Sequence, residues 1–482
     1  MPLPGITATR IAELLPPRDD SVATYRWLAD GLRLLIADGR IPAGQALPAE
    51  RRLTEALGVS RTTVTKAYAH LGEAGFATAR QGSAHVACLP LDRHHLGVGG
   101  ALLPGAELDP DTLDLTCAAS RAPAGTIEAY TRAVATLPAY LAGTGYATAG
   151  LIELRTLIAD RYAERGLPTT PDQIMVVNGA LAGVNLAARA LIQPGDRVLV
   201  ETPSYPNTLQ AARRRGARLV PLPVEATGWD LEQAAAMIAA SRPSVALLIV
   251  DFHNPTGSLM ADEDRARLAS ALRRSRTIAV VDETMLEVRL NDALPPLPFA
   301  AYLPNTVLVG SASKSHWGGL RIGWLRVPSG LGARMAQHRI IEDLGAPLVE
   351  QLATIELLRA RPGLHPERKA ELVRARQAMI EHLPAALPGA TWTVPDGGMS
   401  LWVQLPRDRA TALAQAAVAE GLLLSPGSQF AAVGGLERFV RLPYKDPAPV
   451  VAEAMLRLGN AWRTQAGLPQ MTSATRPRPI VA

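Results

Sequence analysis

The chain has 482 residues, 48% of them hydrophobic and 19% charged, which is enough core material for about two or three globular domains. Its only cysteines, Cys88 and Cys117, exclude a disulfide framework and a metal cluster, and no signal peptide or apolar run of about 18 residues is visible, so we expect a cytoplasmic protein. The net charge of +5 permits nucleic-acid binding but does not establish it.

The first predicted elements form a small helical module. Residues 22–38 carry apolar side chains at helical spacing, and the Gly and Pro residues of 39–44 predict a turn. A short helix is expected over 47–58, ended by Gly58. The next helix begins after Ser60, a good N-cap, and its apolar face consists of Val64, Ala67, Tyr68 and Leu71.

Two helices joined by a tight Gly-containing turn, the second with a basic and hydroxyl-rich start, favour a helix-turn-helix. The start of the second helix can enter a DNA major groove, where Arg61 could read a base or hold a phosphate. The neighbouring threonines can donate to phosphate oxygens. Residues 76–87 predict two short strands about Gly82, a wing whose Arg80 could reach the DNA. A plain helical bundle with a solvated charged face is the alternative.

The stretch 39–86 resembles the winged-helix domain of GntR-type transcription regulators almost end to end. It shares the G-x-x-x-x-G-x-x-L-P-x-x-R-x-L, S-R-x-T-V and L-x-x-x-G runs of that family. The resemblance implies binding to operator DNA, with arginine contacts at Arg51, Arg61 and Arg80 and the wing turn at Gly82. The candidate DNA-binding residues are therefore Arg51, Ser60, Arg61, Thr62, Thr63, Thr65, Arg80 and Gly82.

A segment rich in Gly, Pro and Leu at 89–113 predicts a linker. Beyond it, short apolar runs alternate with helical patterns such as 151–166 and 265–275. This alternation favours a mostly parallel α/β sheet covered by helices on both faces. The expected strands are 174–177, 197–201, 245–250, 278–282, 306–310 and 322–327.

Polar segments follow the ends of five of these strands. Ligands of such sheets bind beyond the carboxyl ends of the strands, so these segments should share one edge. They are "NGALAG" at 178–183, "TPSYPN" at 202–207, "DFHNPTGS" at 251–258, Asp282, and "SASKSHWGGLR" at 311–321. The last contains Lys314, which is costly to bury unless its amine is used; a surface lysine is the alternative.

These side chains fit the binding of pyridoxal 5'-phosphate (PLP), which needs a lysine for an imine, a carboxylate facing the pyridinium nitrogen, and phosphate donors. Lys314 is the expected imine lysine and Asp282 the expected carboxylate. Asn254 could donate to the ring's 3-oxygen, and Tyr205 could stack on the ring. The expected phosphate ligands are the helix start at Gly179, Ala180 and Leu181 and the side chains of Ser311, Ser313 and Arg321.

The same segments resemble fold-type-I aminotransferases, in the same order, over most of 115–460. The resemblance implies that Tyr146 reaches the cofactor phosphate of a neighbouring subunit in a homodimer, and that Arg441 binds a substrate carboxylate. The chain departs from the family where a tyrosine usually bonds to the 3-oxygen, because Thr284 or Met285 stands there. Without that phenol we expect cofactor binding to survive and efficient transamination to be weakened.

A GntR-type winged helix followed by an aminotransferase-like domain resembles the MocR family of regulators. The resemblance implies a transcription regulator whose large domain senses a small amino compound, or the B6 vitamer itself, and alters operator binding. A working aminotransferase with a fused DNA-binding domain, and a relic that only dimerises, are the alternatives. The expected organisation is a DNA-binding domain at 1–88, a linker at 89–113, a large PLP-binding domain at 114–360, a small C-terminal α/β subdomain at 361–462 and a mobile tail at 463–482.

Overall fold

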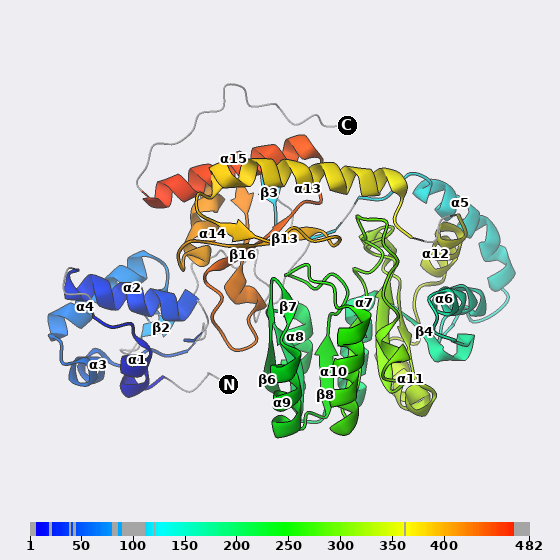
Figure 1. The fold of residues 1–482 in the computed structure, drawn as a ribbon, viewed down its shortest axis with the longest axis horizontal. Helices are drawn as coiled ribbons and strands as arrows, with labels where there is room; N and C mark the ends of the chain where they lie inside the picture. Colours follow the sequence, from blue (N-terminus) through cyan, green and yellow to red (C-terminus); the bar gives the residue numbers. More distant parts are fainter. Residues whose placement is uncertain are drawn as a thin grey trace.

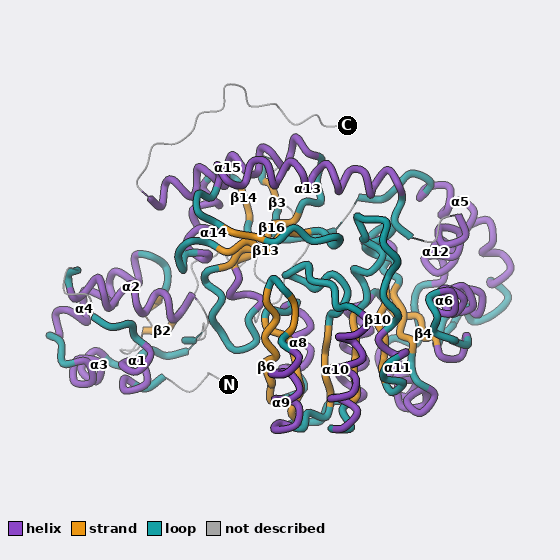
Figure 2. The backbone as a smooth tube through the Cα atoms, viewed as in Figure 1, coloured by secondary structure: helices purple, strands orange, loops and turns teal. Residues whose placement is uncertain are grey.

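The computed structural model describes the chain over residues 6–18, 22–37, 40–41, 45–79, 85–88, 111–119, 121–360 and 363–466. Figures 1 and 2 show three units: a small helical unit at the left, a large sheet with covering helices at the lower right, and a smaller sheet-and-helix unit above it. None of the helices in these residues has the length and apolar character needed to cross a membrane.

The N-terminal unit contains the predicted helices and wing strands. Ser60 caps α4 as predicted, because its Oγ accepts a hydrogen bond from the Thr63 amide at 3.1 Å. Helix α1 is an addition to the predicted elements, and its Ile11 is fully buried. The wing tip, with Arg80 and Gly82, lies outside the described residues. The elements are α1 (Ala8–Leu14), α2 (Thr24–Ala37), α3 (Glu50–Leu57), α4 (Arg61–Glu73), β1 (Ala77–Ala79) and β2 (His85–Ala87).

One face of α4 packs into the core of this unit, and it is the predicted apolar face of Val64, Ala67, Tyr68 and Leu71. The Tyr68 hydroxyl donates to the Pro48 carbonyl at 2.7 Å, which ties α4 to the residues just before α3. Burial raises the pKa of Tyr68, so its hydroxyl stays a hydrogen-bond donor. The opposite, charged face of α4 is exposed.

The large unit is built on one sheet, whose strand order within the described residues is β4-β11-β10-β9-β8-β5-β6-β7. Strands β10, β9, β8, β5 and β6 run parallel, whereas β11 and β7 run antiparallel to their neighbours. This confirms the predicted mostly parallel sheet. Its strands are β4 (Ile174–Val177), β5 (Arg197–Thr202), β6 (Arg218–Glu225), β7 (Gly228–Trp229), β8 (Val245–Leu248), β9 (Ile278–Asp282), β10 (Thr306–Ser311) and β11 (Gly323–Arg326).

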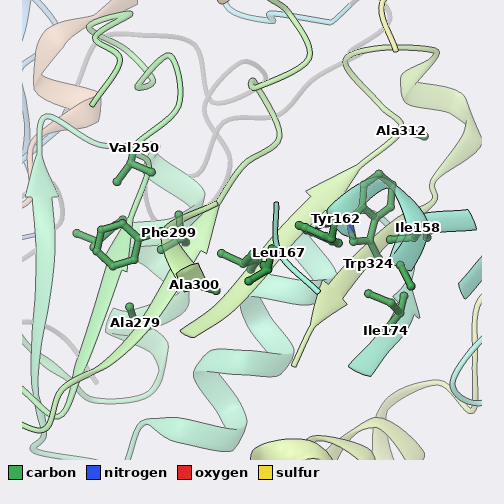
Figure 3. Packing of buried hydrophobic residues seen from close by; sticks show 14 of the residues in the cluster. Ile158, Tyr162, Leu167, Ile174, Val250, Ala279, Phe299, Ala300, Ala312 and Trp324 are labelled. Atoms are coloured by element: carbon green, nitrogen blue, oxygen red, sulfur yellow. Dashed lines mark hydrogen bonds between the residues drawn. The ribbon is translucent and has the colours of Figure 1, made fainter. Parts of the chain in front are cut away.

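Helices cover both faces of this sheet, and each face has its own apolar core. One core contains Tyr162, Phe299 and Trp324, which Figure 3 shows among its packed side chains. Helices α7, α8 and α11 contribute to the other core. The helices of the unit are α5 (Thr126–Thr136), α6 (Ile152–Glu164), α7 (Ala180–Leu191), α8 (Pro206–Arg214), α9 (Leu231–Ser241), α10 (Asp262–Arg274), α11 (Gly332–Glu342) and α12 (Leu348–Ala360).

The C-terminal unit packs three helices on a second, antiparallel sheet of order β12-β13-β16-β15, and a third apolar core lies between them. Its elements are α13 (Pro366–Ala386), β12 (Thr391–Trp392), β13 (Ser400–Gln404), α14 (Ala410–Ala419), β14 (Leu422–Leu423), β15 (Ser425–Pro426), β16 (Phe439–Pro443) and α15 (Ala448–Ala466). Short 3-10 helices along the chain are Leu137–Tyr140, Pro171–Gln173, Phe299–Ala301, Gly318–Leu320, Ser329–Leu331 and Gly427–Phe430.

The segment that enters the large unit belongs structurally to the C-terminal unit. Strand β3 (Leu113–Asp114) pairs in parallel with β14, and Leu115 and Ala118 are buried in the C-terminal core. The predicted boundary at residue 114 instead assigned this segment to the large domain, because a sequence does not display a pairing between strands about 300 residues apart. Helix α15 continues through residues 463–466, where the tail was predicted to begin. Residues 89–110 and 467–482 lie outside the described residues.

Candidate functional site

The candidate site lies at the carboxyl edge of the large sheet. Asp282 is the last residue of β9, and Lys314 comes soon after the end of β10. Asn254 and Tyr205 follow β8 and β5. Because β10, β9, β8 and β5 are neighbours in this order, the four half-buried side chains come to one edge. In Figure 1 this is the edge that faces the C-terminal unit.

An anion-binding corner is formed by the start of α7. Its N-cap, Gly179, has a φ of +83° and makes no side-chain capping bond, so the first amides of the helix have no capping side chain. Gly323 on β11 lets this helix start approach closely, because a Cβ there would lie 2.7 Å from the Ala180 nitrogen. Leu181, the next residue of α7, is half-buried. Free amides at a helix N-terminus suit a phosphate group.

Two serines and an arginine border this corner. Ser311 pairs in register with Gly323, and its Oγ accepts a bond from the Ser313 amide at 3.1 Å. Arg321 donates from Nη2 to the carbonyl of the residue before Gly179 at 3.0 Å. A Cβ on Gly179 would lie 2.5 Å from that same nitrogen, so only glycine leaves room for the guanidinium. The three predicted side-chain phosphate ligands therefore lie beside the predicted helix start.

Lys314 points into the site and donates to a neutral partner. Its Nζ bonds to the carbonyl of Ala118 at 2.5 Å. Burial lowers the pKa of its amine, and the nearby Arg441 lowers it further, while Cys117 and Asp282 oppose the shift. A lysine with a lowered pKa has a larger neutral, nucleophilic fraction near neutral pH.

Asp282 is held by the loop that follows it. Its Oδ1 accepts the Thr284 amide at 2.9 Å. Burial raises the pKa of Asp282, whereas the bonds from Thr284 and the charge of Lys314 lower it. A bound cation facing this carboxyl would favour its ionised form. Met285, one of the two residues predicted to replace the family's tyrosine, is buried in the C-terminal core and offers no hydroxyl.

Arg441 is a buried guanidinium on β16. It donates from Nη2 to the carbonyl of Thr116 and from Nη1 to Asn254 Oδ1 at 3.3 Å, and it lies over the Phe430 ring at 4.9 Å. Its Nε has no hydrogen-bond partner in the described part of the chain. Burial lowers its pKa to about 10, and Tyr205, Cys117 and Asp114 act in the opposite direction. It therefore remains a cation at neutral pH, and no carboxylate of the described residues is bonded to it.

Lys314 and Arg441 both bond to one segment whose role was not predicted from the sequence. We call residues 111–118 the site strap. Its carbonyls at Thr116 and Ala118 accept the bonds from the two cations. Its other end is fixed to the C-terminal unit by the pairing of β3 with β14 and by Arg457, whose Nη1 donates to the Asp111 carbonyl at 2.6 Å. Backbone carbonyls carry no sequence signature, which is why residue patterns missed the strap.

The arrangement fits PLP. An amine, a carboxylate, an aromatic side chain and an uncapped helix start with serines and an arginine all lie at one edge, as that cofactor requires. Tyr205 contributes the aromatic ring, and its hydroxyl accepts a bond from Asn207 Nδ2 at 2.9 Å. Tyr146 is the exception among the predicted cofactor ligands, because it is 72% exposed and makes no hydrogen bond with the described residues of this chain.

The candidate DNA surface is at the start of α4. Arg61 and Thr65 both contact Glu50, at 3.5 and 2.9 Å, and Arg51 pairs with Glu55 at 3.1 Å. The two arginine side chains are 80% and 88% exposed, so these pairs are weak and can be exchanged for phosphate. Of the other candidates, Ser60 and Thr63 are bonded to each other by the cap, and Thr62 is exposed.

Replacing Arg61 with alanine is expected to weaken DNA binding by about 1–3 kcal/mol if its side chain reads a base. Arg10→Ala is a matched control, because Arg10 is also exposed and paired with a carboxylate, Glu13, but lies on α1. The measurement is binding to a duplex that the wild-type protein selects from a random pool, and to unselected duplex. Equal losses on both would assign Arg61 to a phosphate, and no loss on either would remove it from the interface.

Comparison with known families matches both halves of the chain. The family of bacterial regulatory proteins of the gntR type matches residues 24–86. The family of class I and II aminotransferases, which depends on PLP, matches residues 139–455.

Individual relatives follow the same division. The probable rhizopine catabolism regulatory protein MocR of Rhizobium meliloti is 30% identical over 448 residues, which cover 86% of this chain and 89% of that protein. The HTH-type transcriptional regulator TauR of Rhodobacter capsulatus is 28% identical over 89% of this chain and 94% of its own length. The 2-aminoadipate transaminase of Thermus thermophilus is 30% identical over 65% of this chain and 80% of its own.

Among solved structures, the chain is similar to LysN, an α-aminoadipate aminotransferase of Thermus thermophilus complexed with N-(5'-phosphopyridoxyl)-L-leucine. The TM-score is 0.67 at 28% identity, and the similarity covers 75% of this chain and 94% of that one. An archaeal alanine:glyoxylate aminotransferase has the same TM-score of 0.67 at 24% identity and shows the fold alone.

Proposed function

This chain belongs to the MocR-type regulators, in which a GntR-family DNA-binding domain is fused to an aminotransferase-like domain, and we propose that its large domain binds PLP and a small amino effector that changes operator affinity. One observation carries the proposal. The site keeps both a lysine amine and a buried arginine, and among the described residues these two side chains are bonded only to neutral groups, namely backbone carbonyls and the Asn254 amide. An aldehyde and a carboxylate can therefore bind without breaking an ion pair.

Each site residue has a defined part in this binding. When bound at this edge, PLP supplies an aldehyde that reacts with amines. Lys314 provides the protein's amine, and Asp282 holds the proton on the ring nitrogen. The start of α7 with Ser311, Ser313 and Arg321 binds the phosphate, and Tyr205 packs on the ring. Arg441 fixes a carboxylate of the effector, while Asn254 holds the ring's oxygen through its Nδ2.

The proposal favours sensing over turnover. Neither Thr284 nor Met285 has a phenol that could bond to the ring oxygen. Met285 is buried, and the Thr284 amide donates to Asp282. In the absence of that phenol, tuning of the lysine for repeated proton transfer is weaker. An active aminotransferase with a fused DNA-binding domain is the second candidate, supported by the retained Lys314 and by relatives named as transaminases.

The test adds PLP and then a series of small amines and amino acids to the purified full-length protein. Two signals are followed in the same samples: the visible absorption of bound PLP and the affinity for operator DNA. The proposal expects one class of compound to change both signals without consuming itself. Steady conversion of the compound into a carbonyl product would favour the enzyme, and a spectral change with constant DNA affinity would contradict a sensor.

The proposal includes a homodimer with Tyr146 at the interface. Exposed apolar side chains occur on α5, between α5 and α6, and at the first residue of α6, two helices that lie at the right of Figure 1. Ile127, Val134, Leu141, Tyr146 and Ile152 are 80%, 54%, 69%, 72% and 62% exposed. Exposed apolar side chains that lie together on a surface are typical of protein interfaces, so we propose that these five meet a partner. A second copy seated here would bring its Tyr146 toward a cofactor phosphate, which this chain's own fold leaves without that tyrosine.

Ile127→Glu is expected to weaken dimerisation at least about 30-fold, because burying an unpaired carboxylate at an apolar interface costs about 2 kcal/mol or more. Leu294→Glu is the matched control, since Leu294 is 91% exposed but lies outside this surface. Sedimentation across a dilution series measures both. If the two variants associate as the wild type does, the α5 surface is not the dimer interface.

A further inference from the structure

The edge of the large sheet opposite the candidate site is strongly basic. The helix ends and strand starts at this edge lie at the bottom of Figure 1, below α9 and α10. We call it the arginine edge, and its residues are Arg197, Arg214, Arg215, Arg218, Arg242, Arg273, Arg274 and Arg276. Nothing in the proposed cofactor chemistry uses any of them.

The sheet register arranges part of this edge as a row. Arg197 and Arg218 are paired at the starts of β5 and β6. The Ser244 amide bonds to the Arg197 carbonyl, and the Ile278 amide bonds to the Ser244 carbonyl, which places the starts of β8 and β9 next in line. Arg242 lies three residues before the first residue of β8, and Arg276 lies two residues before the first residue of β9. Four adjacent strands span about 14 Å across the sheet, so the row has a fixed length.

The arginine edge has little negative charge to balance it. Asp196 is the one carboxylate among residues 192–197, 213–218, 242–244 and 273–277, and it accepts a bond from the Gln193 amide. Where arginines of this edge are bonded, the acceptors are neutral: Arg197 contacts the Ser241 carbonyl and Arg273 the Tyr302 carbonyl. Arg214, Arg218, Arg242 and Arg276 are exposed, and their side chains make no hydrogen bond or ion pair with the described residues.

Helix dipoles explain only part of this charge. Cations near helix C-termini are stabilising, which accounts for arginines in the last turns of α8 and α10. Arg242 and Arg276, however, have φ of +46° and +57°. Glycine is the residue that ordinarily ends a helix in this conformation, because a Cβ is strained there. An arginine at either position therefore costs backbone strain that a glycine would avoid. We infer that the charge of these arginines is kept because it binds a ligand.

We propose that the arginine edge binds the phosphate backbone of duplex DNA that extends beyond the site held by the winged helix. A duplex carries one phosphate charge per about 1.7 Å of axis, counted over both strands, so about 14 Å carries about eight phosphates, and those on the near side face this row. Guanidinium groups bind phosphate bidentately and keep their charge at every physiological pH. The contact is independent of base sequence and adds to the affinity supplied by α4.

DNA is favoured over other anionic surfaces by two observations. The GntR-family domain of the same chain already brings a duplex to the molecule, so this inference rests on the DNA binding of that domain. The large exposed apolar side chains of the described residues all lie elsewhere, at positions such as Ile127, Leu294 and Ile341, and not on the arginine edge. A membrane-bound surface would need such side chains to insert between lipids.

The test compares two full-length variants with the same loss of charge. The edge variant carries Arg214→Gln, Arg242→Asn and Arg276→Asn, since asparagine tolerates positive φ better than other residues with a side chain. The control variant carries Arg121→Gln, Arg334→Gln and Arg374→Gln, three exposed arginines whose side chains make no hydrogen bond or ion pair with the part of the chain that the structure describes. Affinity for a long random-sequence duplex is measured from about 50 to 200 mM salt. Thermal unfolding of both variants checks that each is folded.

We expect the slope of log affinity against log salt to fall by about 2–3 in the edge variant, or about 0.9 per lost phosphate contact, and to stay at the wild-type value in the control. At about 50 mM salt the edge variant should bind at least about tenfold more weakly. Equal slopes in all three proteins, or equal reductions in both variants, would overturn the proposal.

Two further outcomes are distinct. A loss of binding to phosphatidylserine vesicles with unchanged DNA binding would assign the edge to a membrane instead and overturn the proposal. If the wild-type protein binds no duplex at any salt, both the DNA-binding function and this inference are overturned. If the wild type binds and the edge variant has the same affinity and salt slope, only this inference is overturned.

Discussion

Lys314→Ala is expected to abolish covalent attachment of PLP completely, because the variant loses the amine that lies among the predicted ring and phosphate ligands. The wild-type protein should be yellow, and borohydride should fix the cofactor to the chain. In the variant the visible band of the covalent form should be missing, and reduction followed by denaturation should leave no cofactor on the polypeptide. Peptide mass analysis after reduction identifies the residue in the wild type.

The composition of the chain makes this test unusually clean. The sequence has four lysines: Lys66, Lys314, Lys369 and Lys445. Lys369 is bonded to Asp292 at 2.6 Å and Lys445 to Asp446 at 2.5 Å, whereas Lys314 is bonded to a neutral carbonyl. Lys369→Ala is therefore the matched control and should keep the band. A borohydride-stable link at any of the other three lysines would refute the assignment.

The Lys314 variant should still hold some cofactor without a covalent bond. The uncapped start of α7, Ser311 and Arg321 remain in place, and a helix N-terminus with charge-assisted donors binds phosphate by itself. Dialysis against PLP-free buffer should remove this fraction from the variant but not from the wild type. The comparison separates the contribution of the phosphate corner from that of the amine.

Most of the sheet and the site side chains were predictable from the sequence. Strands with both faces buried are short continuous apolar runs, so "IAVVD" and "TVLVG" identified β9 and β10. Parallel strands bring their carboxyl ends to one edge, which places Asp282 and Lys314 together without any knowledge of contacts. The N-cap at Ser60 and the buried face of α4 followed from local patterns in the same way.

The elements that escaped prediction share a non-local cause. Strand β6 contains Pro221 and Pro223, and prolines argue against a strand. At these two positions β6 pairs with β5 on one side and with no strand on the other, because β7 pairs only with Val224 and Glu225. The N–H groups that the prolines lack would face this unpaired side, so no bond between strands is lost. Strand β3 is two residues long, and it is a strand only because it pairs with β14. The site strap acts through backbone carbonyls, and residue types say nothing about those.

Arg441→Ala is expected to abolish the response of DNA binding to effectors that carry a carboxylate, and to leave basal DNA binding unchanged. Losing one partner of a buried, hydrogen-bonded charge pair costs about 2–5 kcal/mol, which corresponds to roughly 30- to 5,000-fold weaker effector binding. The covalent PLP band should persist, because Lys314 and the phosphate corner are untouched. Titrations of both proteins with one operator, with and without effector, measure the response.

The expectation depends on how the site strap connects the site to the rest of the chain. A carboxylate on Arg441 competes with the Thr116 carbonyl for Nη2, and a covalent bond at Lys314 removes the donor that holds the Ala118 carbonyl. The strap then loses its bonds to both Lys314 and Arg441. Its other end stays in place through the pairing of β3 with β14, where the chain arrives from the DNA-binding domain. An effector can shift DNA affinity only through such differential binding to two arrangements.

Arg376→Ala is the matched control for Arg441, because Arg376 also lies in the C-terminal unit and also donates to a backbone carbonyl, that of Pro395, outside the site. It should respond as the wild type does. Arg441→Lys keeps the charge but not the bidentate geometry, so its response should be intermediate. A full response of Arg441→Ala to a carboxylate effector would refute this route. If the effector is the B6 vitamer itself, Arg441 has no carboxylate to hold, and the loss of response should appear in Lys314→Ala instead.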